Sequence, residues 1–209
     1  MLIVAFLLSY LLGAIPFGVL IARTSGVDIR AVCSGNSGAT NVWRTLGPVA
    51  GSLVFALDVL KGLAAPFIAR VLIGPQEFWP IAICALLAVI GHTFSCFLKF
   101  KGGKGIATGL GMALGLMPMP ALLALAVWAG VLVLSRMISV ASIVACIALP
   151  VAALYFKAPS PFVVVIAIIA LVAFLKHVPN MKRIAAKTEP KINIGKKRAS
   201  TPVSSKATP

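Results

Sequence analysis

The chain has 209 residues, of which 60% are hydrophobic and 11% charged, and its mean hydropathy is +1.07. Soluble globular domains carry about 25% charged residues, so this composition excludes an ordinary soluble domain and indicates an integral membrane protein. The net charge of +15 arises from 19 Lys and Arg against four acidic residues. In a membrane protein, topology and attraction to anionic lipid account for such an excess, so we expect contact with membrane lipid and no nucleic-acid partner.

Long apolar runs predict the membrane helices in chain order. The predicted spans are roughly 2–22, 50–73, 78–98, 106–117, 121–135, 140–156 and 161–176. The fourth is half-length, because Pro118 and Pro120 divide an apolar run that is too long for one helix and too short for two. The expected fold is therefore all-α: a polytopic transmembrane bundle of about seven helices, some short or broken. An alternative with five spans, in which 106–135 is one tilted helix and 140–176 another, stays open.

The distribution of basic residues predicts the orientation. No basic residue precedes the first apolar run, and Arg23 follows it, which predicts an N-terminus outside the cytoplasm and, with seven spans, a cytoplasmic C-terminus. Most Lys and Arg then lie on the cytoplasmic side, with Arg70 and Lys157 opposite. With this orientation, the segments that follow the first, third, fifth and seventh spans lie on the cytoplasmic face, and these include the polar and glycine-rich segments. We expect residues 1–186 to form a single transmembrane domain and 187–209 a disordered basic tail.

The segment SGNSGATNVWR, residues 34–44, is the first candidate for chemistry. Gly35 lets the backbone turn so that N–H groups converge, and Arg44 adds a fixed positive fork. Further hydrogen-bonding groups come from Ser34, Asn36, Thr40 and Asn41. The segment is suited to binding an oxyanion, and the alternative is an ordinary capped turn.

The segment FKGGKG, residues 100–105, is the second candidate. Gly102 and Gly103 precede Lys104 at the predicted start of a helix, where main-chain amides and a lysine favour an anion. The spacing differs from the GxxxxGK[ST] of a nucleotide-binding loop, which argues against nucleotide hydrolysis. A tight turn whose lysines only signal topology is the alternative.

Two further polar groups begin and end predicted helices. Arg136, Ser139 and Ser142 lie at the start of the sixth span, where the two serines share a face. His177, Asn180 and Arg183 recur every three residues after the seventh. A serine at a helix start is more often a cap than a ligand, and a lone histidine at a membrane boundary is usually an interfacial residue, so both alternatives stay open.

Ionisable residues also lie within the apolar spans. Asp58 and Lys61 are one helical turn apart in the second span, and His92 ends the third. Ionisable groups at this depth are costly and therefore suggest function, although a pair that neutralises itself is an equal account.

Absent motifs narrow the chemistry. The chain lacks a GxSxG elbow, an HExxH motif and a carboxylate pair suited to glycosyl transfer. The His-x-x-x-x-Asp device of the common glycerolipid acyltransferases is missing, since Phe97 and Lys182 stand in the fifth position after the two histidines. The four cysteines show no metal-ligand spacing, and we expect them to be small core residues. These absences favour a pocket that binds phosphates, without a metal or cofactor.

The motifs together resemble a known family. GAIPFGVLIA, SGNSGATNVWRTLG, LDVLKG, GHTFSCFLKFKGGKGIATGLG and HVPNMKR, in this order, are similar to segments of the bacterial membrane glycerol-3-phosphate acyltransferases that use acyl phosphate. The resemblance implies an inner-membrane enzyme that transfers an acyl group from a long-chain acyl phosphate to the 1-hydroxyl of glycerol 3-phosphate. The products would be lysophosphatidic acid and phosphate, and the soluble enzyme that makes acyl phosphate is a candidate partner.

The family's site residues carry over by position. The resemblance implies site roles for members of all three motifs, and we expect catalytic roles for Ser34, Lys104, His177 and Asn180 and substrate binding by the other members of the first two motifs. From their position at a helix start, Ser139 and Ser142 are also expected to bind substrate. Asp58, Lys61, His92, Arg136 and Glu189 are more remote candidates. Lys187 departs from the family pattern, because a glycine is usual there. A small transporter or a lipid-binding accessory protein are the alternatives from other classes; a transporter would show internal repeats, which we do not find.

Overall fold

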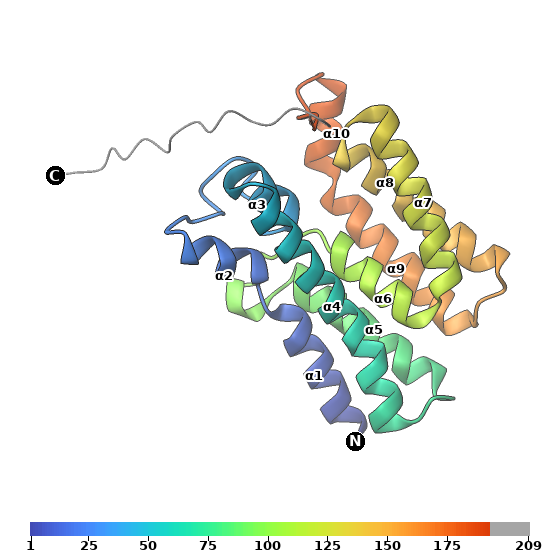
Figure 1. The fold of residues 1–209 in the computed structure, drawn as a ribbon. Helices are drawn as coiled ribbons and strands as arrows, with labels where there is room; N and C mark the ends of the chain where they lie inside the picture. Colours follow the sequence, from blue (N-terminus) through green and yellow to red (C-terminus); the bar gives the residue numbers. More distant parts are fainter. Residues whose placement is uncertain (193–209) are drawn as a thin grey trace.

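The computed structural model describes residues 1–192, and every regular element in this range is helical (Figure 1). The elements are α1 (Leu2–Ala14), α2 (Phe17–Thr24), α3 (Ala39–Leu46), α4 (Pro48–Ile73), α5 (Phe78–Thr93), the 3-10 helix η1 (Cys96–Leu98), α6 (Ile106–Leu116), α7 (Pro118–Ser135), α8 (Ile138–Tyr155), α9 (Ser160–Lys176) and α10 (Val178–Ala185).

Within residues 1–192, five segments are long and apolar enough to cross a membrane: Leu2–Thr24, Pro48–Ile73, Phe78–Leu98, Pro118–Ser135 and Ile138–Tyr155. Helices α9 and α10 meet at a bend of 48° and together would make a sixth, whereas α6 is a shorter apolar helix. The chain is thus an all-α, polytopic membrane protein. The five-span alternative merged the wrong segments, because α6 ends before Pro118 and α8 is separate from α9.

The first predicted span is broken, a feature that its apolar pattern did not predict. Pro16 lacks an N–H group and follows the end of α1, so carbonyl groups of the preceding turn lose their helical partners. Side chains replace them: Ser95 Oγ donates to Ala14 O at 2.6 Å, and Lys61 Nζ donates to Ile15 O at 2.8 Å. Two other segments therefore hold the break in place, as backbone buried away from water requires.

The half-length helix α6 is buried against α4 through small residues. A Cβ on Gly62 of α4 would overlap the Thr108 carbonyl of α6, and one on Gly111 of α6 would overlap the Val59 carbonyl of α4. Such close backbone approach is typical of membrane helix pairs. Arg70 Nη1 donates to Gly115 O at 2.7 Å and so satisfies a carbonyl near the end of α6. A short helix is tolerated here because protein surrounds it.

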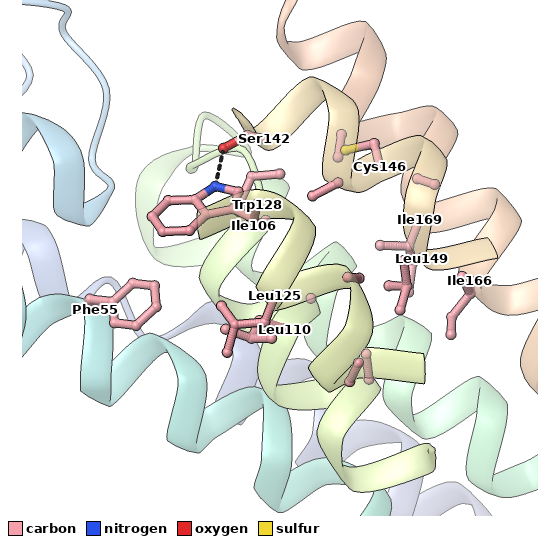
Figure 2. A pocket seen from close by; sticks show the side chains of 18 residues that line it. Phe55, Ile106, Leu110, Leu125, Trp128, Ser142, Cys146, Leu149, Ile166 and Ile169 are labelled. Carbon is pink, nitrogen blue, oxygen red and sulfur yellow. Dashed lines mark hydrogen bonds between the residues drawn. The ribbon is translucent and has the colours of Figure 1, made fainter. Parts of the chain in front are cut away.

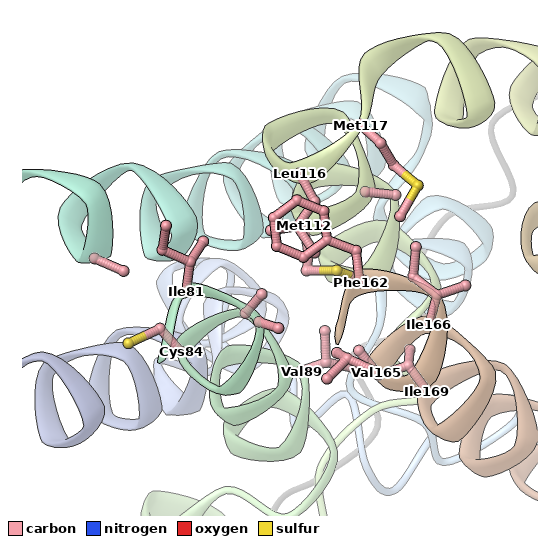
Figure 3. Close-up of a cluster of buried hydrophobic side chains, with 14 of the residues drawn as sticks. Ile81, Cys84, Val89, Met112, Leu116, Met117, Phe162, Val165, Ile166 and Ile169 are labelled. Carbon is pink, nitrogen blue, oxygen red and sulfur yellow. The ribbon is translucent and has the colours of Figure 1, made fainter. Parts of the chain in front are cut away.

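Helices α5, α6 and α9 share the main apolar core (Figure 3). Its larger members include Ile81, Val89, Met112, Leu116, Phe162, Val165, Ile166 and Ile169. Many large apolar side chains of α7 and α8, such as Leu134 and Leu154, instead face outward, as expected for surfaces in contact with lipid. Cys84 belongs to the core, but Cys33 and Cys96 are exposed, so the expectation of core cysteines was wrong for these two.

The polar segments gather at one end of the bundle. Helices α2, α3 and α10 lie at the end opposite the N-terminus (Figure 1). Residues 193–209 of the predicted basic tail lie outside the described residues. Residues 187–192 are described, and among them Glu189 is buried. The boundary expected at residue 187 therefore falls inside the packed part of the chain.

Candidate active site

A cavity of about 430 Å³ opens among α3, α4, α6, α7, α8 and α10. Most of the predicted site residues, from every motif, line it: Ser34, Asn36, Thr40, Asn41, Arg44, Asp58, His92, Lys104, Ser139, Ser142, His177, Asn180 and Glu189. Among residues 1–192, no three His, Cys, Asp or Glu side chains gather as metal ligands would. The tertiary structure therefore joins segments that are up to 155 positions apart in the sequence, between Ser34 and Glu189, into one cavity.

Five predicted residues do not line the cavity. Gly35 is exposed and serves the turn, with φ +66. The Arg136 side chain is also exposed, and its carbonyl accepts a hydrogen bond from Ile192 N–H. Lys61 is ion-paired with Asp58, which itself lines the cavity. Gly102 and Gly103 form the backbone before Lys104. Arg136, a remote candidate from the sequence, does not line the cavity, because the left-handed turn at φ +57 ends α7 there and leaves the side chain exposed.

The amides of the second motif are not the anion donors that the sequence suggested. Gly102 N–H donates to Thr93 O and Gly103 N–H to His92 O, each at 3.1 Å. The groups that remain for an anion are the Lys104 side chain and the first turn of α6, whose N–H groups have no partner within their helix. Gly105 precedes this turn with φ +81, a conformation that favours glycine.

The first motif holds its own loop together. Asn41 is buried, and its Nδ2 donates to Ile29 O at 2.8 Å and to Val32 O at 3.2 Å, while its Oδ1 accepts from Ser34 N–H at 3.2 Å. Asn36 Oδ1 accepts from Gly38 N–H at 2.8 Å. Asn41 is therefore a scaffold for the loop, and the side chains of Ser34, Thr40 and Arg44 are better placed to meet a ligand.

A chain of hydrogen bonds fixes the amide of Asn180. Lys104 Nζ donates to Asn180 Oδ1, and Asn180 Nδ2 donates to Glu189 Oε1 at 2.7 Å. Arg183 Nε forms an ion pair with Glu189 Oε2, also at 2.7 Å. This order leaves one orientation for the amide, with its oxygen toward Lys104.

Lys104 and Glu189, two charged members of this hydrogen-bond chain, have shifted pKa values. Burial, reinforced by Arg183 and Arg44 and opposed by Glu189, lowers the pKa of Lys104 to about 8. Burial raises the pKa of Glu189, but hydrogen bonds from Asn180 and Arg183 outweigh it and hold that pKa below its ordinary value. At neutral pH the site therefore contains a carboxylate and a mostly charged lysine.

His177 lies between α9 and α10 and lines the same cavity. Its Nδ1 lies 2.7 Å from Ala173 O, a carbonyl that can only accept, so Nδ1 carries a proton. In the neutral ring, Nε2 is then the free acceptor. The bond to the preceding turn sets the tautomer, as second partners of functional histidines commonly do.

The polar cavity adjoins an apolar one of about 100 Å³ between α6, α7, α8 and α9 (Figure 2). The two share Phe55, Gly105, Ile106, Leu125, Trp128 and Ser142. Trp128 Nε1 donates to Ser142 Oγ at 3.3 Å, so Ser142 stands where polar and apolar walls meet. Sequence reasoning missed Phe55 and Trp128, because an aromatic residue in an apolar run looks the same whether it faces lipid or a ligand.

Residues 188–192 cross the polar end of the cavity. Ile192 N–H donates to Arg136 O at 2.7 Å, and Arg44 Nη2 lies 3.5 Å from Pro190 O. Lys187, at the start of this segment, has φ +56, a conformation in which glycine is favoured. The segment was expected in a separate tail, but it ties α3, α10 and the α7–α8 turn together around the site.

Known proteins share this sequence and fold. The family model of glycerol-3-phosphate acyltransferase matches residues 3–187. A glycerol-3-phosphate acyltransferase from Geobacter sulfurreducens is 44% identical over 87% of this chain and 92% of its own length. One from Jannaschia sp. is 46% identical over 89% of this chain and 90% of its own.

Solved structures agree. The crystal structure of PlsY (YgiH), an integral membrane glycerol 3-phosphate acyltransferase, in its glycerol 3-phosphate form superposes with a TM-score of 0.88 at 38% identity, covering 92% of this chain and 96% of that one. Its lysophosphatidic acid form gives a TM-score of 0.85 at 36% identity, with 92% and 95% covered. On sequence and fold together, this chain belongs to the family of integral membrane glycerol-3-phosphate acyltransferases.

Proposed function

We propose that this acyltransferase moves a fatty acyl group from acyl phosphate to the 1-hydroxyl of glycerol 3-phosphate, giving lysophosphatidic acid and phosphate. One observation carries the proposal: a polar cavity containing Lys104 and Arg44 adjoins an apolar cavity between membrane helices. The first suits phosphate groups and the second an acyl chain. The related structures hold glycerol 3-phosphate and lysophosphatidic acid, which supports the same acceptor and product here.

The proposed reaction needs no covalent enzyme intermediate. Acyl phosphate is a mixed anhydride, so the hydroxyl oxygen attacks the acyl carbon, the bond from that carbon to the phosphate oxygen breaks, and phosphate leaves. The proton of the hydroxyl passes to Nε2 of His177 or to an oxygen of the departing phosphate. The enzyme's task is to bring two anionic substrates together and hold the hydroxyl in line.

The cavity offers groups for each part of this task. In the proposed arrangement, Lys104, Arg44 and the first turn of α6 hold the phosphates. His177, Asn180 and Ser34 position the attacking hydroxyl, and Glu189 keeps the Asn180 amide in its orientation through the 2.7 Å hydrogen bond. Ser142 lies at the boundary where the reacting carbonyl would meet the apolar cavity.

We further propose an inner-membrane location with the active site on the cytoplasmic side. The support is the excess of basic residues beside the polar end, which favours a periplasmic N-terminus and a cytoplasmic C-terminus if α6 and the α9–α10 pair also count as spans. A cytoplasmic site would face the soluble enzyme that makes acyl phosphate. Cysteine labelling of intact cells at Lys157 and Lys101, each changed to Cys, tests the orientation, since only the former should react from outside.

The activity test uses the purified protein in lipid vesicles with palmitoyl phosphate and labelled glycerol 3-phosphate. We expect lysophosphatidic acid from this donor and none from palmitoyl-CoA. Lys104→Ala should reduce turnover by about a hundredfold or more, as expected for the loss of one oxyanion donor. Lys101→Ala is the matched control, because Lys101 is exposed on the same loop. The proposal fails if palmitoyl phosphate gives no product.

A further inference from the structure

Three buried ionisable side chains have no part in the proposed reaction. Asp58 and Lys61 of α4 are 2% and 3% exposed, and His92 near the end of α5 is 9% exposed. Ionisable groups buried in a membrane helix bundle are costly, so they persist where they pair with one another or serve a function. The geometry shows that the three contact one another and that His92 contacts the loop that carries Lys104.

The three side chains form a connected line. Lys61 Nζ lies 2.8 Å from Asp58 Oδ1, and Nδ1 of His92 faces the same oxygen at 3.6 Å. Lys61 Nζ also donates to Ile15 O at the break between α1 and α2. The line therefore starts at the broken first span and ends at the imidazole of His92.

His92 in turn supports the loop that carries Lys104. Its carbonyl accepts the Gly103 N–H, and the neighbouring Thr93 carbonyl accepts the Gly102 N–H. The ring lies directly against the α-carbon of Gly103, since a Cβ built there would overlap Nε2, Cε1 and Cδ2 of the imidazole. The loop is thus held both by its main chain and by the face of the ring.

We infer that Asp58, Lys61 and His92 are positioning residues that hold the Gly102–Lys104 loop in its phosphate-binding conformation. The inference rests on the proposed function, in which Lys104 and the first turn of α6 bind phosphate. The Asp58 carboxylate faces Nδ1 of the ring at 3.6 Å, and Lys61 ties that carboxylate to the α1–α2 break. The pair is therefore more than self-neutralising, because its consequence is the place of Lys104.

Reciprocal substitution tests the contact between His92 and Gly103. His92→Ala should raise the KM for glycerol 3-phosphate about tenfold or more, because the loop loses its support. Gly103→Ala should do the same, because its methyl group displaces the ring. In the double variant the methyl group occupies the space of the missing ring, so its KM should be lower than that of Gly103→Ala alone. Such non-additivity is expected for residues that are in contact or structurally coupled, and not for independent sites.

Controls separate positioning from general damage. Gly130→Ala, where an added Cβ meets nothing within 4 Å, should leave KM unchanged and act independently of His92→Ala. Thermal unfolding in detergent monitors the fold, and assays in native membranes normalised to protein amount serve if a variant purifies poorly. Asp58→Asn, which keeps the shape but not the charge, should also raise KM for glycerol 3-phosphate more than it changes kcat.

Two results would overturn the inference: KM effects that simply multiply in the double variant, or variants that lower only kcat and folded yield. Lys104→Ala keeps this failure distinct from failure of the proposed function. If Lys104→Ala raises KM and the His92 variants do not, only the positioning role is lost. If Lys104→Ala itself leaves KM normal, the phosphate-binding role of the loop is wrong.

Discussion

The lowered pKa of Lys104 makes the alkaline limb of the pH profile a direct probe of the site. A lysine side chain in water has a pKa of 10.5, whereas the pKa of Lys104 is lowered to about 8 by burial, with Arg183 and Arg44 acting in the same direction. The side chain is charged below this pKa and neutral above it. About nine-tenths of the free enzyme therefore carries the charge at pH 7 and about one-tenth at pH 9.

The size of the fall in kcat/KM follows from the strength of the hydrogen bond that the charged Lys104 donates to the phosphate. A hydrogen bond from a charged donor contributes about 1.5–3 kcal/mol, which corresponds to about 10- to 100-fold in kcat/KM. We expect kcat/KM for glycerol 3-phosphate to fall about tenfold per pH unit above pH 8, until it reaches the rate that the neutral amine supports. The measurement is initial rate at subsaturating glycerol 3-phosphate from pH 6 to 10 with palmitoyl phosphate saturating.

The comparison with Lys104→Arg isolates the cause. Arginine stays charged throughout this range, so the variant should start from a lower rate, because its fork differs in shape, and should lack the limb near pH 8. Lys101→Arg on the same loop should keep the limb. A flat wild-type profile, or an unchanged limb in Lys104→Arg, would refute the assignment.

Three other substitutions test the fold and the hydrogen-bond chain. Gly62→Ala should destabilise by about 1–3 kcal/mol, because its Cβ would overlap the Thr108 carbonyl; Gly130→Ala is the control, and a similar unfolding temperature for both would contradict the close packing of α4 on α6. Arg70→Met should lower the free energy of unfolding by about 1–3 kcal/mol, because it removes the hydrogen bond to the Gly115 carbonyl near the end of α6. A large loss of kcat in folded protein would argue against this purely structural role. Glu189→Gln should lower kcat about tenfold or more, since it removes the charge that two donors share and frees the Asn180 amide; unchanged kcat would count against that positioning.

The local sequence predicted most helix positions and the family of this protein. The apolar runs and the prolines at 118 and 120 predicted where helices lie and where one is cut short, because the length of a span and the missing N–H of proline act on neighbouring residues alone. Ser139 and Ser142 share a buried face as their spacing required. The motif spacing also identified the family, which the similarity to known acyltransferases confirmed.

The tertiary structure decided which polar groups face the cavity and which already hydrogen-bond to the protein's own backbone. Asn41, Gly102 and Gly103 looked like ligand donors, but their N–H groups bond to carbonyls of the same loop or of the helix end that precedes it. Glu189 looked like part of a tail, yet it is buried against Asn180. These partners lie only 9–12 positions away, but irregular loops bring them into contact, so helix periodicity cannot reveal whether a polar group in a loop is already satisfied. Local sequence therefore indicated most of the helices, and only the folded loops and their packing in the bundle determined which polar groups are left for the substrates, because burial and hydrogen-bond partners are set by the conformation.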